Sequence, residues 1–452
     1  MMLMAFVLGI SMSGCSFMGL DAQMAISPPK ANADQQEIHR LLQGDNTELR
    51  FIYPKSGEYR SAIIMKDFTG DGQEDAVGFT WTASGVRVDF LEKDSKTGSW
   101  ALISGYDNSA TQVDRVCFGD LYGDGRMDVL IGWGNAQIAP ATPGVYHYNR
   151  ETVSEEIFDS KYDEMLLADF NGDGVEEVFL IQTARQMLMD DESHGLIPAA
   201  AQIYTLKGGN ASLISETEAN NDVTVFTSIK FGKITDDITG AVLDGTLSDG
   251  RMTTQAFYFD RYQKLWTVPR YPNDPEVLSP FIRPAGTYFS AADINRDGII
   301  EMPAAKKLPG IPDDIKPDST SYLVDWSIPE ISDDVEYKTV LSTFANTAEG
   351  YWFETPHWLK DELTAISDPA ERAVTYYKVK TEEAEYGETE YLLGSRLFTI
   401  KVSGGMEWQK SGGYEVLKER DDTVYAIKTY TLETKYALAV ENIKNDFHLF
   451  TG

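Results

Sequence analysis

The sequence predicts a mainly β protein whose central part is a β-propeller of repeated four-stranded blades. Three observations support this prediction. An acidic loop that contains glycine recurs along the chain, each copy lies between two short apolar runs, and the copies are far enough apart for one four-stranded unit each. Five units are readable, and degenerate units would raise the count to as many as seven.

Four copies of the loop share one nine-residue register. They are loop 1 (Asp67–Asp75), loop 2 (Asp120–Asp128), loop 3 (Asp169–Glu177) and loop 5 (Asp293–Glu301). Each has acids at positions 1, 5 and 9 and glycine at position 6. Position 3 is Thr or Asn, except in loop 2, where it is Tyr122. Calcium takes about six to eight oxygen ligands, and glycine permits the sharp turn that directs them inward.

The loops therefore predict calcium as the cofactor. The predicted ligands are the side chains at positions 1, 3, 5 and 9: Asp67, Thr69, Asp71, Asp75, Asp120, Asp124, Asp128, Asp169, Asn171, Asp173, Glu177, Asp293, Asn295, Asp297 and Glu301. In loop 2 a backbone carbonyl or a water must replace the side chain at position 3, which predicts a weaker site. The alternative is that the Asp-Gly and Asn-Gly pairs only form turns. Four copies in one register favour calcium.

The loops differ from EF-hands, which need a bidentate Glu at position 12 and flanking helices. Position 12 is Gly78, Ile131, Leu180 or Ala304, and short β-rich runs follow each loop. The predicted calcium loops therefore lie between strands.

A degenerate copy, loop 4 (Lys233–Ala241), has Asp237 at position 5. Successive first positions are then 53, 49, 64 and 60 residues apart. Two interpretations of Lys233 stay open: its ammonium takes the place of the ion, or the segment is an ordinary exposed turn.

The first unit contains four predicted strands, near residues 61–66, 76–81, 86–92 and 100–106. The segment Leu49–Pro54 precedes this unit and is a candidate for a strand that closes the last blade. Closure would remove the exposed sheet edges.

These loops resemble the FG-GAP and VCBS repeats of integrin-α-like propellers, in which Asp-x-Asn-x-Asp-Gly-x-x-Asp loops bind calcium between blade strands. The resemblance covers residues 49–342 and implies a fold and an ion. It does not imply one function, because such propellers serve adhesion, scaffolding and some enzymes. The stretch "SPPKANADQQEIHRLLQGD" and the residues after it are also similar to lipoproteins of Gram-positive bacteria with a helix ahead of such a propeller. The predicted helix is Ala33–Leu42, with Asn32 as its cap and Gly44 as its stop.

The first 15 residues, "MMLMAFVLGISMSGC", have the length and apolar character of a signal peptide and are too short to span a bilayer. Ser13-Gly14-Cys15 resembles a bacterial lipobox, which implies lipidation of Cys15 and an extracytoplasmic, membrane-anchored protein. Two features depart from the lipobox pattern: no Lys or Arg precedes the apolar run, and Met12 stands where Leu is usual. The alternative is an ordinary buried N-terminal segment.

Composition narrows the partners. The formal net charge is −32, from 71 acids against 39 bases, and an anionic surface repels nucleic acid and acidic lipid headgroups. The expected membrane contact is therefore the lipid anchor alone, and the chain is expected to be a monomer. Two cysteines, Cys15 and Cys117, are too few for a disulfide framework or a thiolate metal site.

Connections between the second and third strand of each unit should lie on the face opposite the calcium loops. The connection is tight in the first unit, and three later ones read as long loops: Gly134–Gly144, Thr183–Pro198 and Lys307–Thr320. Function concentrates on loops that a rigid scaffold holds. These loops therefore predict a recognition surface for a polysaccharide or protein ligand, with tolerated insertion as the alternative.

The chain is expected to divide into a signal peptide (1–15), a linker with the short helix (16–48), the propeller (49–342) and a small α+β domain (343–452). The last part contains an aromatic cluster of Tyr351, Trp352, Phe353 and Trp358. Two interpretations are open: the cluster binds a sugar ring or a peptide, or it packs in the core. Core packing is favoured because aromatic side chains dominate protein cores.

The sequence contains few residues or motifs that indicate catalysis. The five histidines His39, His147, His194, His357 and His448 show no metal-ligand spacing, and no nucleophile elbow or phosphate-binding loop is present. The sequence therefore favours a non-enzymatic binding or scaffold module for an envelope or extracellular ligand. The alternative is a cell-surface polysaccharide hydrolase or lyase with its site on the face opposite the calcium loops, where His147 and His194 would be the first candidates. A purely structural spacer is a third possibility.

Overall fold

The computed structural model describes residues 33–44, 48–135, 138–188, 194–274, 279–287, 289–308, 321–332, 335–383, 389–404, 412–430 and 433–450. The described chain is mainly β, and its sheets are antiparallel and mostly four-stranded, as the sequence predicts. Neither of the α-helices in these ranges is long and apolar enough to cross a bilayer. Cys15 and Asn32 lie outside the described residues, so lipidation and the helix cap stay predictions.

Five sheets follow one another along the chain. Sheet 1 contains β1 (Ile63–Lys66), β2 (Asp75–Thr82), β3 (Gly85–Lys93) and β4 (Trp100–Asn108). Sheet 2 contains β5 (Gln112–Gly119), β6 (Asp128–Asn135), β7 (Ile138–Tyr148) and β8 (Val153–Ile157). Sheet 3 contains β9 (Glu164–Ala168), β10 (Glu177–Gln182), β13 (Ala200–Thr205) and β14 (Ser212–Glu218). Sheet 4 contains β15 (Val223–Lys233), β16 (Thr239–Leu247), β17 (Met252–Phe259) and β18 (Leu265–Val268). Sheet 5 contains β19 (Met302–Lys307), β20 (Ser321–Ile331), β21 (Val335–Asn346), β22 (Tyr351–Glu354) and β28 (Phe447–Leu449).

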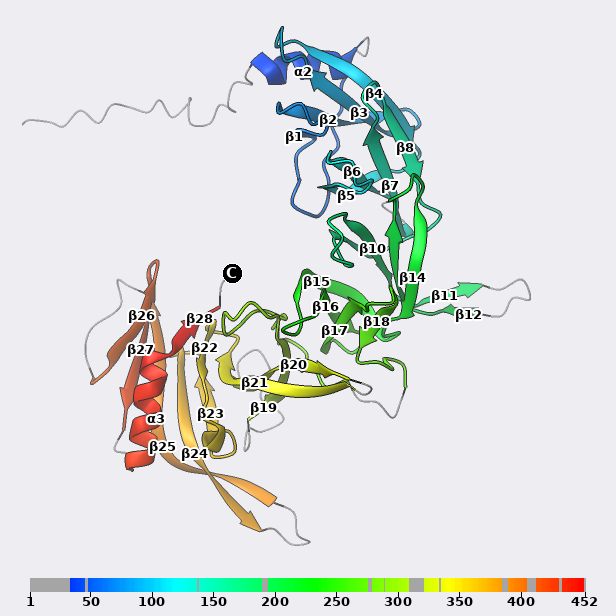
Figure 1. Cartoon of the computed structure of the whole chain (residues 1–452). Coiled ribbons are helices and arrows are strands. Elements are labelled where there is room, and N and C mark those ends of the chain that lie inside the picture. The colour runs from blue at the N-terminus through cyan, green and yellow to red at the C-terminus, as the bar shows by residue number, and fades with distance from the viewer. Residues whose placement is uncertain are drawn as a thin grey trace, which may run out of the picture.

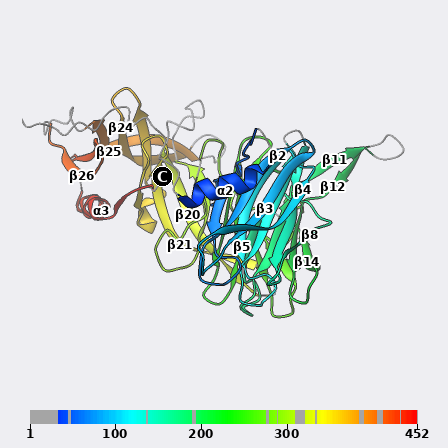
Figure 2. The same cartoon turned by 90° about the horizontal axis from the view of Figure 1, so that it is seen from above.

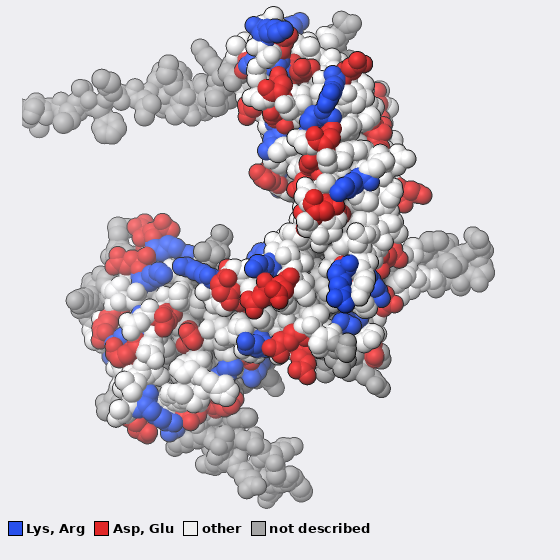
Figure 3. Space-filling view, in the orientation of Figure 1, with Lys and Arg blue, Asp and Glu red and all other residues white. Residues whose placement is uncertain are grey.

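Each sheet packs face to face on the next through buried apolar side chains. The rings of Phe79 in sheet 1 and Trp133 in sheet 2 lie 6.5 Å apart, and those of Phe179 in sheet 3 and Phe257 in sheet 4 lie 5.5 Å apart. Separate apolar clusters join sheets 2 and 3 and sheets 4 and 5. No such cluster of the described residues joins sheet 5 to sheet 1. In Figure 1 the sheets follow an open arc, and Figure 3 shows the hollow on its inner side.

The helix α2 (Ala33–Gln43) covers the free face of sheet 1. It begins at the predicted residue and ends at Gly44, which has a φ of 50° and donates its N–H to the Arg40 carbonyl at 3.2 Å. Ile38 and Leu42 pack in one cluster with Ala76, Leu91 and Trp100. The face that a closed ring would press against sheet 5 is therefore covered by this helix.

The segment Leu49–Pro54 pairs with sheet 1 and not with the last sheet. Phe51 forms a bridge with Thr80, and the Ile52 N–H donates to the Phe79 carbonyl at 3.2 Å. The short β1 leaves this stretch of β2 unpaired, and the preceding segment fills the vacant edge. The closing-strand prediction is wrong for this reason.

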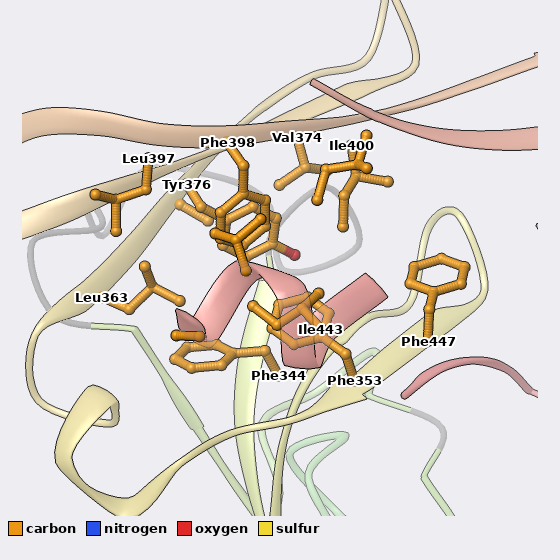
Figure 4. Packing of buried hydrophobic residues seen from close by; sticks show 14 of the residues in the cluster. Phe344, Phe353, Leu363, Val374, Tyr376, Leu397, Phe398, Ile400, Ile443 and Phe447 are labelled. Carbon is orange, nitrogen blue, oxygen red and sulfur yellow. The ribbon is translucent and has the colours of Figure 1, made fainter. Parts of the chain in front are cut away.

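The C-terminal part forms one further sheet with a helix. The sheet contains β23 (Leu363–Asp368), β24 (Ala373–Glu383), β25 (Thr389–Gly404), β26 (Glu415–Arg420) and β27 (Thr423–Thr429). The short 3-10 helix η2 (His357–Leu359) precedes it, and α3 (Thr434–Asn445) follows it. Figure 4 shows how Phe344 and Phe353 of sheet 5, Tyr376 and Phe398 of the C-terminal sheet and Ile443 of α3 meet in one core. The predicted boundary after residue 342 falls inside β21, because sheet 5 continues to Glu354.

The predicted long loops are only partly loops. Most of the stretch from Gly134 to Gly144 belongs to strands, because β7 begins at Ile138 and pairs with β6 through Pro143. This position tolerates proline although proline has no backbone N–H to donate, because the Pro143 carbonyl accepts the Phe158 N–H at 3.0 Å.

The insertion between β10 and β13 contains a hairpin of β11 (Arg185–Leu188) and β12 (His194–Ile197). Both views show this hairpin projecting away from the sheets (Figures 1 and 2). The third predicted loop lies outside the described residues beyond Leu308.

Candidate cation-binding loops

The acidic loops occupy equivalent places in the sheets. Loops 1, 2 and 3 join the first two strands of sheets 1, 2 and 3, as predicted. In loop 5 the first strand is reduced to a bridge between Ala292 and Glu301, directly before β19. The strand order therefore brings one acidic loop to the same end of each of these four sheets.

The acid at position 1 holds the turn together. In loop 1 the Asp67 carboxylate accepts the N–H groups of Gly70 at 2.7 Å and Gly72 at 2.9 Å. Both glycines have positive φ, 78° and 86°, a conformation that residues with a side chain rarely adopt. Loops 2 and 3 repeat these bonds at 2.7 and 2.8 Å. The shared turn explains why the register repeats so strictly.

The acid at position 5 closes a smaller turn. Asp71 accepts the N–H of Gln73 at 2.8 Å, and Asp173 and Asp297 accept the N–H two residues later at 3.0 and 2.9 Å. Position 5 therefore lies exposed at the tip of each loop, with one carboxylate oxygen engaged by its own backbone.

The acid at position 9 is the buried member. Asp75, Asp128, Glu177 and Glu301 are each at most 1% exposed. One oxygen of each accepts a backbone N–H near the start of the loop, such as the Thr69 N–H at 3.0 Å from Asp75 Oδ2 and the Ile294 N–H at 3.0 Å from Glu301 Oε2. The partner of the second oxygen differs from loop to loop, and this difference distinguishes the four loops as candidate metal sites.

In loops 1 and 5 the second oxygen is buried without a hydrogen-bond partner. The orphaned atoms are Asp75 Oδ1 and Glu301 Oε1. The Thr69 hydroxyl at position 3 of loop 1 also lacks a partner in regular hydrogen-bond geometry, although it lies close enough to the Asp75 carboxyl to lower the pKa of that group. Buried polar atoms are normally satisfied, and an orphaned carboxylate oxygen costs free energy. A hard cation is the kind of group that would satisfy these oxygens.

Burial perturbs the pKa of these carboxyls. It raises the pKa of Asp75 to about 6 and the pKa of Glu177 and Glu301 to about 7, against the lowering effect of the backbone N–H groups. Nearby loop acids raise the pKa values further. A bound cation would oppose this shift by stabilising the charged carboxylates.

Loop 2 has basic side chains where loops 1 and 5 have orphaned oxygens. His147 Nδ1 lies 2.7 Å from Asp128 Oδ1, and Arg126 forms an ion pair with Asp124. The imidazole also stacks on Tyr122, with the ring centroids 4.2 Å apart. His147 therefore lies in β7 beside the acidic loop and not on the opposite face, which corrects its predicted place.

Loop 3 satisfies its acids in another way. The Asn171 amide donates to Glu177 Oε1 at 2.5 Å, and the Lys207 ammonium lies 2.8 Å from Asp173 Oδ2. Asn171 Oδ1 meanwhile accepts the Asp173 N–H at 2.9 Å. The amide would have to turn before its oxygen could bind a cation.

In the degenerate loop 4, the Lys233 ammonium donates to the Asp236 carbonyl of the same loop at 3.2 Å. Lys233 is exposed. The structure thus places the ammonium within the loop while leaving it open to solvent, and both interpretations of this residue stay open.

No group of three or more His, Cys, Asp or Glu side chains converges on a metal-sized position in the described ranges. The reason lies in the hydrogen bonds above, because the acids at positions 1 and 5 turn oxygens toward their own backbone. The donor chemistry of loops 1 and 5 nevertheless fits a hard cation, since each holds a buried carboxylate oxygen without a partner. Calcium binding therefore stays a prediction.

Sequence reasoning missed three residues beside the loops: Glu92, Arg126 and Lys207. Glu92 belongs to β3, and the charge of Asp71 adds to the burial that raises the Glu92 pKa. Lys207 follows β13. Strand register could have found Glu92 and Lys207, because the start of the second strand faces the end of the third. Arg126 stands at position 7 of loop 2 itself.

The face opposite the loops carries a depression of about 980 Å³. It lies at the tight β2–β3 connection and is lined by Trp81, which is 40% exposed, together with Arg50, Arg87 and Asp107. Arg87 is paired with Asp89 and Asp107 at 2.9 and 3.2 Å. The depression thus combines an exposed aromatic ring with charged groups that already have partners.

The other predicted residues take structural places. Tyr351 and Phe353 are fully buried in the core, Trp352 is 9% exposed and stacks on His448, and Trp358 at 41% is the exposed member of the aromatic cluster. Burial raises the pKa of the Cys117 thiol to about 11, as expected for an inert cysteine.

Comparison with known proteins identifies no family. No protein-family model matches the chain, and no curated protein matches it. Among solved structures, the chain is similar to the Penicillium chrysogenum α-L-arabinanase complexed with arabinobiose, at 10% identity over 76% of this chain and 96% of that chain, with a TM-score of 0.26. It is also similar to the AfRom2 CNH domain, at 12% identity over 84% of this chain and 99% of that chain, with a TM-score of 0.23. Scores this low assign neither fold nor function.

Proposed function

We propose that this protein is a membrane-anchored, extracytoplasmic calcium-binding lipoprotein of the FG-GAP/VCBS type that acts as a binding or scaffold module. Its five sheets are the blades of a propeller-like array, with α2 covering the first blade and the C-terminal sheet following the last. The lipid anchor is Cys15, and the ligand is an envelope or extracellular polysaccharide or protein.

The observation that carries the proposal is the pair of orphaned oxygens on the buried carboxyls Asp75 and Glu301. Burial of a carboxylate with one oxygen unpartnered costs free energy that a bound cation would offset. In loop 1 the ion would be held by Asp67, Thr69, Asp71 and Asp75, and in loop 5 by Asp293, Asn295, Asp297 and Glu301. Bound calcium would neutralise these acids and fix the turn between two strands of the blade.

A binding role is supported by the opposite face. The described depression there is open and contains the exposed Trp81, an arrangement suited to a sugar ring or a peptide side chain. The hydrolase or lyase alternative gains no support from the described histidines. His147 contacts loop 2 instead of the opposite face.

Two experiments test the proposal. Calcium titration of the purified full-length protein should show saturable binding that Asp75→Asn and Glu301→Gln each reduce. In cells, labelled palmitate should be incorporated into the wild-type protein and not into Cys15→Ala, which should lose membrane association. Absence of calcium binding would refute the metal assignment, and a soluble, unlabelled wild-type protein would refute the anchor.

A further inference from the structure

The residue that faces position 9 across the strand ladder differs between sheets 1 and 2. In sheet 1, Ala76 pairs with Leu91, so the next step of the ladder sets Asp75 opposite Glu92. Glu92 is a further acid beside loop 1. The residue opposite position 9 in sheet 1 is therefore an oxygen donor of the kind that a hard cation prefers.

Sheet 2 has a base at the same step. Val129 pairs with Tyr146, which sets Asp128 opposite His147. The imidazole Nδ1 lies 2.7 Å from Asp128 Oδ1, the atom whose counterpart in loop 1 is orphaned. The ring therefore stands where a cation bound to Asp128 would have to stand.

Two further features of loop 2 act in the same direction. Tyr122 replaces the small oxygen ligand at position 3, and its ring covers the imidazole with a centroid separation of 4.2 Å. Arg126 pairs with Asp124 at position 5, and His147 Nε2 lies 4.0 Å from the same carboxylate. Loop 1 has Gln73 at the position of Arg126, and the Arg126 side chain of loop 2 lies against Gly70 of loop 1.

We infer that loop 2 takes no calcium because the His147 imidazole, which lies opposite position 9, occupies the place of the ion, whereas the acid Glu92 stands at that step in sheet 1. The inference rests on the proposed calcium function of loops 1 and 5. Loop 2 keeps the calcium-loop backbone, and its internal contacts hold that turn in the absence of metal. Blade 2 is then stable at calcium concentrations that leave loops 1 and 5 empty.

The test is the calcium stoichiometry of the full-length protein, measured by equilibrium dialysis against calcium chloride. His147→Glu reproduces the sheet 1 arrangement in sheet 2 and should bind one calcium more than the wild type. Glu92→His reproduces the sheet 2 arrangement in sheet 1 and should bind one fewer. His357→Ser, at an exposed histidine on η2, is the matched control and should bind as the wild type does.

Asparagine variants of position 9 complete the test. Asp128→Asn should leave the stoichiometry unchanged, whereas Asp75→Asn should lower it by one. If His147→Glu fails to fold by circular dichroism, Glu92→His and Asp128→Asn still decide. Loss of one calcium in Asp128→Asn, or an unchanged stoichiometry in a folded His147→Glu, would overturn the inference while calcium binding by the protein stands. A wild type that binds no calcium would instead overturn the proposed function on which the inference rests.

Discussion

His147 and Asp128 lie opposite each other on neighbouring strands of sheet 2, with the imidazole Nδ1 2.7 Å from Oδ1 of a fully buried carboxylate. The equivalent oxygens of Asp75 and Glu301 have no partner. One backbone motif thus surrounds its buried acid in two ways, with a side-chain partner for the second oxygen in loop 2 and without one in loops 1 and 5. The predictions below separate the two.

Stability of the calcium-free protein should depend on pH. Burial raises the pKa of Asp75 to about 6 and of Glu301 to about 7, so between about pH 4 and pH 7 the folded state holds more protons than the unfolded state. Its stability should then fall as pH rises through this window, by about 1.4 kcal/mol for each unit of pKa shift at most. Denaturant unfolding in chelator should show higher stability at pH 5 than at pH 8. The same measurement in calcium should show a smaller difference, and an identical pH dependence with and without calcium would contradict the assignment.

Glu301→Gln should have opposite effects in the two conditions. In chelator at pH 8 the substitution removes a buried negative charge that has one oxygen without a partner, so the melting temperature should rise or stay constant. In calcium it removes a ligand, so the calcium-induced rise should shrink. Thermal unfolding in both buffers tests whether the substitution changes the melting temperature in these two different ways. Glu330→Gln, at an exposed position of β20, serves as the control and should change neither value.

Arg283 is a purely structural cation and should be essential for the junction of sheets 4 and 5. Its guanidinium is fully buried, lies 2.9 Å from Asp244 and donates to the carbonyls of Phe281 and Pro303 at 3.0 Å. Arg283→Met leaves Asp244 without its charge partner and should cost about 3–5 kcal/mol of unfolding free energy. Arg251→Met, which breaks an exposed pair with Asp249, should cost at most about 1 kcal/mol. Equal effects in urea unfolding would contradict the structural role.

Helix α2 should stabilise sheet 1 as an end cap. Ile38 is fully buried against the sheet, so Ile38→Ala should cost about 2–5 kcal/mol, whereas Arg40→Ala on the exposed side should be nearly neutral. Gly78→Ala should also loosen the helix, because the added Cβ would lie 2.7 Å from a Leu42 methyl carbon. Hydrogen exchange of the β2 amides should accelerate in the two damaging variants. Unchanged exchange in both would show that the helix does not protect the sheet.

Local pattern predicted the strands and helix well, because each follows from nearby residues. The alternation in β3, with Val86, Val88 and Phe90 buried, identifies a strand on its own. The position of Leu49–Pro54 could not be predicted, since it depends on a vacant edge that the short β1 leaves in the folded sheet. The proline-containing start of β7 was predicted as a loop because its residues are typical of turns. It forms a strand because it pairs with the neighbouring strand β6, which its own sequence does not reveal.

The candidate sites show the same limit. The nine-residue register placed the acidic loops between strands correctly, because all their backbone bonds are local. Which loops have a basic side-chain partner depends on His147 and Lys207, which come from later strands or connections. They are 19 and 30 residues from the last residues of loops 2 and 3. Loop sequence alone therefore predicted four sites, with a weaker one in loop 2, whereas the structure shows side-chain partners for the second oxygen of the position 9 acid in loops 2 and 3 and none in loops 1 and 5.

The most direct test of the central claim is the melting temperature of the full-length protein in millimolar calcium and in excess chelator, for the wild type and for the double variant Asp75→Asn/Glu301→Gln. Two sites saturated about a hundredfold above their dissociation constants add about 5 kcal/mol, which predicts a wild-type rise of roughly 6 °C for a chain of this length. The double variant should lose most of this rise. A wild type that melts at the same temperature in both buffers would contradict calcium stabilisation, and its acidic loops would then be turns without an ion.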